Sequence, residues 1–117
     1  MKYLLLIVNA EDDWNRHPPA DQNRVIDQMN AFRNELKAAG KYVVCGGLAP
    51  ASEAKTIRLQ SGTRGVQDGL ALVQTSTRDQ VTGFFVVEAS SGNEAVEWAQ
   101  RMPIIAGAIE IRPIAME

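Results

Sequence analysis

Two segments of this chain are apolar at odd and even positions alike, and this pattern constrains the fold more than any other feature. They are Tyr3 to Val8 (YLLLIV) and Phe84 to Val87 (FFVV). Successive side chains of a strand point to opposite faces of a sheet, so both faces of these strands should be buried. Two helices can cover only one face of a four-stranded sheet. We therefore expect a second copy of the chain to cover the other face, because twofold homodimers are the commonest symmetric assembly.

Two segments have the sequence pattern of amphipathic helices. The first helix is predicted from Pro19 to Ala39, with Gly40 as the residue that ends it. Ser91 and Glu94 form an S-x-x-E capping box that predicts a second helix from Gly92 to Pro103. The apolar positions expected to face the core are Val25, Met29, Phe32 and Leu36 in the first helix, and Ala95, Trp98, Ala99 and Met102 in the second.

The rest of the chain predicts loops and strands. Ala10 to Pro19 is polar and broken by proline, which predicts a loop. The glycines of Ser61 to Gly69 predict a hairpin loop, with Leu70 to Val73 as its return strand. Strands are expected at Lys2 to Asn9, Tyr42 to Cys45 (stopped by Gly46 and Gly47), Thr56 to Gln60, Thr82 to Glu88 and Ala108 to Ile114.

This order of elements is β-α-β-β-α-β with an extra hairpin, which predicts a ferredoxin-like α+β fold in a single domain over residues 1–117. Two such sheets pairing face to face would enclose a space between them. Ile109 and Ile111 alternate with Glu110 and Arg112, so the two polar side chains are candidates to line that space.

Composition argues against several classes of partner. The net charge is −2 and the 12 basic residues are scattered, so we expect no nucleic-acid partner. The N-terminal apolar run of six residues is far shorter than the roughly 20 that cross a membrane. A single cysteine, Cys45, and a single histidine, His17, cannot build a structural zinc site. We expect a cytoplasmic protein without membrane association, bound metal or cofactor.

Several residues are candidates for a site, each with a plainer alternative. His17, beside Trp14, is a candidate general base or acid, with Trp14 as a ligand contact; the alternative is an exposed loop histidine. Glu110 is a second candidate base, and Arg112 could bind a carboxylate; alternatively the two pair with each other. Asp68 could contact a ligand or belong to an Asp-Gly turn. Cys45 is expected to be an inert thiol in an apolar strand.

The chain resembles the YCII-related family, whose members often carry a DGPF motif. The resemblance rests on KYLLLI, FRNELKAAG, GGL, TIRLQSG, the segment from Thr82 to Pro103 and IEIRPI, and so runs over nearly the whole chain. It implies a ferredoxin-like fold that pairs into a dimeric α/β barrel. Function in this family is mostly unassigned.

Two departures from the family pattern bear on function. Asp68 and Gly69 are followed by Leu-Ala and not by Pro-Phe. Arg78, a candidate ligand contact, and Asp79 stand where the family has a Lys-Glu pair. The enzyme-like branch of the family uses a His-Asp pair, but Met29 and Ala38 stand near those places. The dyad is therefore missing.

Three functions remain open on the sequence. The first is a small-molecule-binding or regulatory dimer with its pocket between paired sheets. The second is a lyase- or isomerase-type enzyme that moves a proton on a small organic acid or ring compound, with His17 or Glu110 as the base. The third is a structural or protein-interaction dimer.

Overall fold

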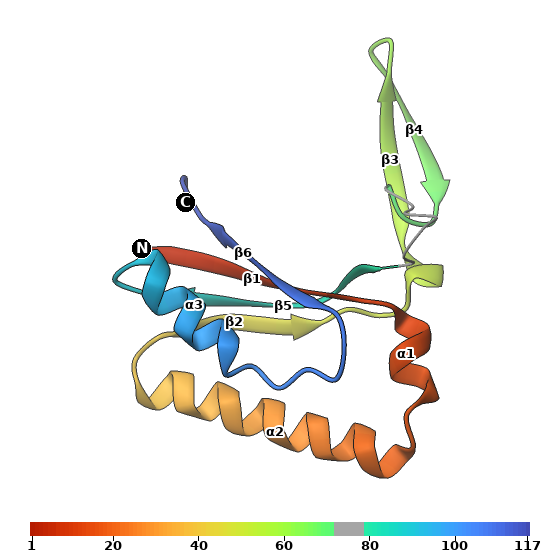
Figure 1. The fold of residues 1–117 in the computed structure, drawn as a ribbon. Coiled ribbons are helices and arrows are strands. Elements are labelled where there is room, and N and C mark those ends of the chain that lie inside the picture. Colours follow the sequence, from red (N-terminus) through yellow and green to blue (C-terminus); the bar gives the residue numbers. More distant parts are fainter. Residues whose placement is uncertain (72–78) are drawn as a thin grey trace.

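The computed structural model of the protein describes residues 1–71 and 79–117. Figure 1 shows a four-stranded sheet with helices on one side and a separate hairpin. The elements in chain order are β1 (Lys2–Asn9), α1 (Glu11–Arg16), α2 (Pro19–Ala38), β2 (Tyr42–Gly47), a 3-10 turn (Ala51–Glu53), β3 (Lys55–Gln60), β4 (Thr63–Asp68), β5 (Gln80–Glu88), α3 (Gly92–Gln100) and β6 (Ala108–Pro113).

The main sheet has the strand order β2-β5-β1-β6, and each neighbouring pair is antiparallel. This order and the two helical crossovers are consistent with a ferredoxin-like fold, so the predicted α+β class is confirmed. The two apolar segments that opened the sequence argument lie side by side as β1 and β5, with Leu5 opposite Phe85.

The core lies between the sheet and the two longer helices. Leu5 and Val87 of the sheet are fully buried, as is Leu36 of α2. Phe32 of α2 meets Phe85 edge to face, with ring centroids 5.4 Å apart. Burying each of these large side chains contributes about 1.5–3 kcal/mol to the free energy of folding. The inward faces predicted for both helices are confirmed: Phe32, Leu36, Ala95, Ala99 and Met102 are buried, and Met29 and Trp98 pack against them.

The segment predicted to be a loop after β1 was predicted wrongly, because it contains the short helix α1. Glu11, Asp12 and Asp13 stand in its first turn and Arg16 in its last. This arrangement of charges suits the helix dipole. The two prolines that suggested a loop follow the helix, and Pro19 is the first residue of α2, where its missing N–H costs nothing.

Strand β2 continues through Gly46 and Gly47, which were predicted to stop it. Gly46 lies opposite Phe84 in the sheet, and a Cβ atom there would come within 3.0 Å of the Phe84 ring. A side chain at this position would press on the neighbouring aromatic ring, and glycine leaves room for it.

The return strand of the hairpin is β4, Thr63–Asp68, and the predicted position from Leu70 onward was wrong. The tight turn is formed by Ser61 and Gly62, both with positive φ (49° and 79°), as a two-residue hairpin loop prefers. Leu72 and Val73, part of the predicted strand, lie outside the described residues.

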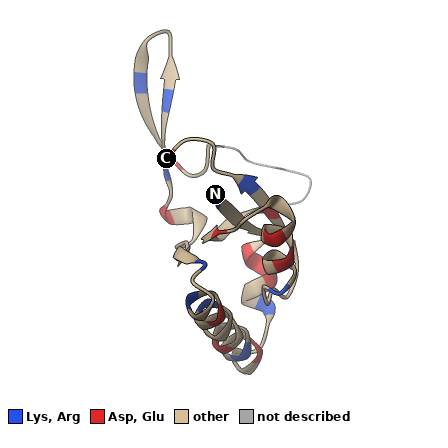
Figure 2. Cartoon of the chain, turned by 90° about the vertical axis from the view of Figure 1, so that its left-hand side faces the viewer, with Lys and Arg blue, Asp and Glu red and all other residues tan. Residues whose placement is uncertain are grey.

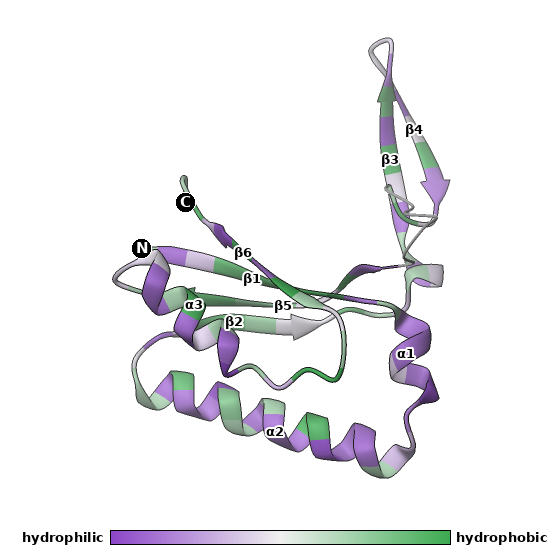
Figure 3. Ribbon diagram, in the orientation of Figure 1, coloured by the Kyte–Doolittle hydropathy of each residue, from purple (hydrophilic) through white to green (hydrophobic). Residues whose placement is uncertain are grey.

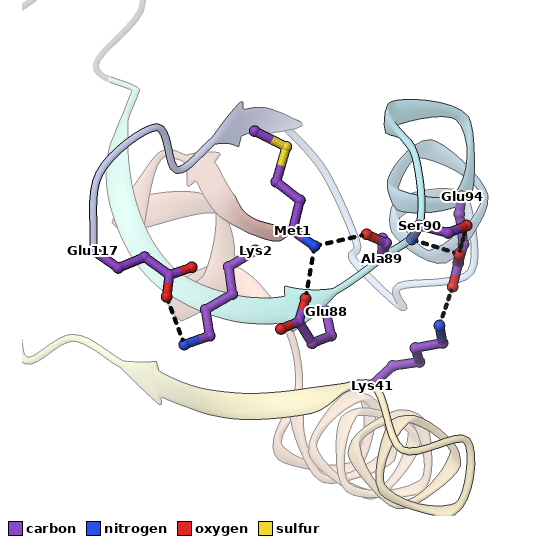
Figure 4. Close-up of polar contacts among 8 residues, drawn as sticks. All are labelled: Met1, Lys2, Lys41, Glu88, Ala89, Ser90, Glu94 and Glu117. Carbon is purple, nitrogen blue, oxygen red and sulfur yellow. Dashed lines mark hydrogen bonds and ion pairs between the residues drawn. The ribbon is translucent and has the colours of Figure 1, made fainter.

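The N-terminus is tied to the end of β5, and the first strand to the last residue of the chain (Figure 4). The terminal amino group lies 3.0 Å from a Glu88 carboxylate oxygen, and Lys2 lies 3.1 Å from Glu117.

Helix α3 begins with the predicted cap, because the Ser91 hydroxyl accepts a hydrogen bond from the Glu94 N–H. The Glu94 carboxylate binds the N–H and hydroxyl of Ser90 (2.8 and 2.5 Å), one residue before the expected partner.

The sheet face turned away from the helices is also apolar. Leu4 lies opposite Val86 and Leu6 opposite Phe84, and Val44 pairs with Val86 from the other side. We call these five residues the outer face. In the described chain none of them is buried, whereas their neighbours Tyr3, Leu5, Phe85 and Val87 on the helix side all are.

The hairpin β3-β4 projects on the side of the sheet opposite α2 (Figure 1). Ile57 and Val66 face each other across it, and Leu59 is on the same face. Apolar and polar residues alternate along β3, while β4 has Val66 as its strongly apolar residue (Figure 3). The predicted strand at Thr56 to Gln60 is confirmed. The apolar side of the hairpin is not buried within the described part of the chain, because its three apolar residues are 63–71% exposed.

Charges are mixed over the surface of the protein. Acidic and basic segments alternate along α2 in Figure 2, and no basic stripe is visible there. Within the described ranges, no helix is both long enough and apolar enough to cross a membrane.

Candidate functional site

A cavity of about 630 Å³ lies on the helix side of the sheet, beside the packed core. This volume is within the range of sites for small molecules. Helices α1 and α2, strands β1, β2 and β5, and the loops after β2 and α3 all contribute to its walls. The apolar lining residues include Ile7, Trp14, Val25, Met29, Phe85 and Ile104.

The backbone has two special features where the cavity meets the sheet. Gly83 of β5 lines the cavity, and a Cβ atom there would lie 3.1 Å from the Gly46 carbonyl oxygen and 3.2 Å from Ile7. The pairing of β1 with β5 shifts register between Ile7 and Val8. Such a bulge bends a strand and re-aims its side chains. Glycines and a bulge therefore coincide where the cavity meets the sheet.

Few polar groups line the cavity, and most of them are already bonded within the protein. The Thr82 hydroxyl donates to the Asn9 side-chain oxygen at 2.6 Å. The Glu11 carboxylate accepts from the Ala51 N–H, also at 2.6 Å, and so ties α1 to the loop after β2. Arg33 differs, because its Nε is buried and has no hydrogen-bond partner among the described residues.

Cys45 also lines the cavity and is linked to Tyr42 of the same strand. The Tyr42 hydroxyl donates to the Cys45 sulfur at 3.4 Å. This hydrogen bond, together with burial, raises the pKa of Tyr42, while the positive charge of Arg33 acts to lower it. Arg33 therefore lies within electrostatic range of Tyr42, the residue that bonds to Cys45 of the cavity wall.

Comparison with known proteins places the chain in a family. The sequence profile of the YCII-related domain matches residues 1–116. The chain belongs to the YCII-related family. It is 28% identical over 119 residues to an uncharacterized protein of Rhizobium meliloti (strain 1021), an alignment that covers 99% of this chain and 94% of the relative.

Among the residues predicted for a site in this YCII-related protein, Trp14 lines the cavity. His17 does not line the cavity. Its Nδ1 donates to the Asp13 carbonyl oxygen at 2.5 Å, and His17 is the residue that caps the C-terminal end of α1. Its proposed role as a base stays a prediction.

Three other predicted site residues lie away from the cavity. Glu110 and Arg112 are exposed on β6 and lie 3.4 Å from each other. They border the outer face, opposite Leu6 and Leu4. Asp68 is the last residue of β4 and pairs with Lys55 at 2.7 Å, so it does not belong to the hairpin turn. Arg78 lies outside the described residues.

Sequence reasoning overlooked Arg33 and Glu11 as lining residues. Arg33 follows Val25 and Met29 at spacings of four, which places all three on one stripe of α2. A charged residue that continues an apolar helical stripe was the available signal. Glu11 had no comparable signal, because its segment was interpreted as a loop.

Proposed function

We propose that this YCII-related protein binds a small molecule in the cavity between α2 and the sheet, without catalysing a reaction on it. The cavity itself carries this proposal: about 630 Å³ of space with mainly apolar walls and a few polar groups, among them one arginine whose Nε has no partner in the described chain. Binding sites for small molecules have this composition.

The missing dyad supports binding without catalysis. Met29 stands near the place expected for the histidine of the enzyme-like branch, and it lines the cavity. A thioether can neither accept nor donate the proton that an imidazole would transfer. Among the described lining residues the ionisable side chains are Glu11, Arg33 and Cys45, and Glu11 is bonded to the backbone of Ala51.

Filling the cavity tests the proposal. The Val25→Trp variant places a bulky ring in the cavity wall and should abolish the thermal stabilisation given by any small acid or aromatic compound that stabilises the wild type. A ligand at 100 times its dissociation constant should add ~2.7 kcal/mol to the free energy of unfolding. Val96→Trp, at an exposed position of α3 that does not line the cavity, is the matched control. Equal stabilisation in both variants would contradict the proposed place of binding.

We also propose that the protein is a homodimer joined through the outer face. Leu4, Leu6, Phe84, Val86 and Val44 form one contiguous apolar surface across three strands. Exposed apolar patches of this kind mark protein interfaces. The identical surface on a second copy is the simplest cover, because one patch can then serve both subunits about a twofold axis. A space between the two sheets, bordered by Glu110 and Arg112, would follow from this pairing.

The hairpin supports the same arrangement. It projects on the side of the outer face, and its apolar residues Ile57, Leu59 and Val66 have no cover within the described chain. A two-stranded hairpin is at best marginally stable alone in water. Contact with a second copy would bury this apolar side. Sedimentation equilibrium at micromolar concentration should give twice the chain mass of 12.8 kDa, and a single species of that chain mass would contradict the dimer.

A further inference from the structure

Arg33 is the charged residue of the cavity that has no partner among the described residues. It extends from α2 into the cavity wall, one turn after Met29. Its Nε is shielded from solvent and makes no hydrogen bond to any described residue. A buried donor without a partner costs about 1–3 kcal/mol, and more when it is charged. The Arg33 side chain therefore has neither an ion-pair partner nor a hydrogen-bond acceptor within the described residues, and an anion bound in the cavity that Arg33 lines would supply both.

Outside the hairpin β3-β4, every other arginine among the described residues pairs with a carboxylate. The pairs are Arg16 with Asp13, Arg24 with Asp21, Arg101 with Glu35 and Arg112 with Glu110. No ion pair among the described residues includes Arg33. Glu11, the acidic residue that also lines the cavity, has one carboxylate oxygen bonded to the Ala51 N–H.

On these grounds we infer that the ligand is an organic monoanion with an apolar body, and that Arg33 binds its carboxylate. This inference rests on the proposed binding function and names its ligand class. A guanidinium matches a carboxylate with two parallel hydrogen bonds. Trp14, Phe85 and Ile104 supply apolar walls for the rest of the molecule. A phosphate ester carries about −1.5 to −2 charges and three strong acceptor oxygens, more than one arginine balances.

Matched acids and amides test this inference directly. Isothermal titration calorimetry would compare benzoate, phenylacetate and 3-methylbutanoate with the corresponding neutral amides, and phenyl phosphate with benzoate. The wild type should bind at least one acid tenfold or more tightly than its amide, because hydrogen bonds to a charged group contribute this much. Phenyl phosphate should bind no more tightly than benzoate.

Variants of Arg33 assign the preference to this residue. Arg33→Met should remove the preference for acid over amide while leaving amide binding in place, and Arg33→Lys should keep part of it. Arg24→Met is the control, since Arg24 lies on the same helix but pairs with Asp21 at the surface; it should bind like the wild type. If Arg33→Met does not fold, Arg33→Gln replaces it, and the wild-type comparison of acid with amide needs no variant.

The outcomes separate this inference from the proposed function. Equal binding of acids and amides by the wild type, or an unchanged preference in Arg33→Met, would overturn the role of Arg33 and leave the binding cavity standing. Tighter binding of phenyl phosphate than of benzoate would overturn the carboxylate class. If no acid, amide or phosphate bound to the wild type, both the inference and the proposed function would fail.

Discussion

The ionisation of Glu94 is strongly shaped by the fold. Hydrogen bonds from the Ser90 hydroxyl and N–H, and then the Lys41 ammonium 3.0 Å away, lower its pKa from 4.5 to about 2 (Figure 4). A carboxyl group with a lowered folded-state pKa stabilises the protein above its unfolded-state pKa, and that stabilisation is lost as the pH falls through the folded-state value. The contribution of Glu94 should therefore be complete above about pH 4.5 and fade towards pH 2.

The Glu94→Gln variant tests this prediction. Between pH 4.5 and 2, the midpoint of urea unfolding should fall less steeply for Glu94→Gln than for the wild type. Glu97→Gln, at an exposed position of the same helix, should follow the wild type. Parallel curves for Glu94→Gln and the wild type would show that the contacts of the Glu94 carboxylate with Ser90 and Lys41 do not stabilise the fold.

The Ser91→Ala variant removes the other half of the cap and should lower the free energy of unfolding by ~1 kcal/mol at neutral pH.

At the residue scale, prediction from the sequence succeeded where the physical signal is local. The cap at Ser91 and the ending of α2 at Gly40 (φ 71°) each depend on a few neighbouring residues, and both were found. Arg33 and Gly83 were overlooked as site residues because their roles depend on which strand lies against which helix. The pairing of β1, β2 and β5 that creates the cavity joins segments far apart in the chain.

At the scale of elements, the hairpin is the feature that a second subunit would explain. The double variant Ile57→Ser with Val66→Ser removes two apolar side chains that face each other on one side of β3-β4. If that side contacts a second copy, the dissociation constant of the dimer should rise tenfold or more, since burying each side chain contributes on the order of 1.5–3 kcal/mol. Analytical ultracentrifugation over a dilution series would measure the change.

The control uses the opposite side of the same hairpin. Thr56 and Gln67 face each other there, so Thr56→Ser with Gln67→Ser changes a matching pair without touching the apolar side. This control should dimerise like the wild type. If the apolar variant dimerised as tightly as the control, the hairpin would have no part in the interface.

The elements themselves show where sequence patterns are informative. Long periodic or continuous apolar segments were predicted with nearly correct bounds, as for β1, α2 and α3. The errors fell on short polar segments: α1, and the return strand β4 with its residues Thr63–Asp68, of which only Val66 is strongly apolar. These segments bury no side chain in the described chain, so their sequences lack the hydrophobic periodicity that would indicate a helix or strand.

At the scale of the whole molecule, the two faces of the sheet have different proposed functions, ligand binding on one face and dimerisation on the other. The helix side combines the core with a cavity that holds an arginine, while the outer face presents the apolar surface for a second copy. The sequence predicted a two-sided apolar sheet, and the structure bears this out. It also predicted a ligand pocket bordered by Glu110 and Arg112, whereas the cavity found in the described chain lies on the opposite side of the sheet.

Nuclear magnetic resonance of the ¹⁵N-labelled protein would locate the binding site most directly. In a titration with phenylacetate, the largest changes in amide chemical shift should fall on residues that line the cavity, such as Gly46, Gly47, Gly83 and Ala106. Amides of β6 near Glu110 and Arg112 should change little. Largest changes on β6, or no saturable change at all, would contradict the claim that this protein binds its ligand between α2 and the sheet.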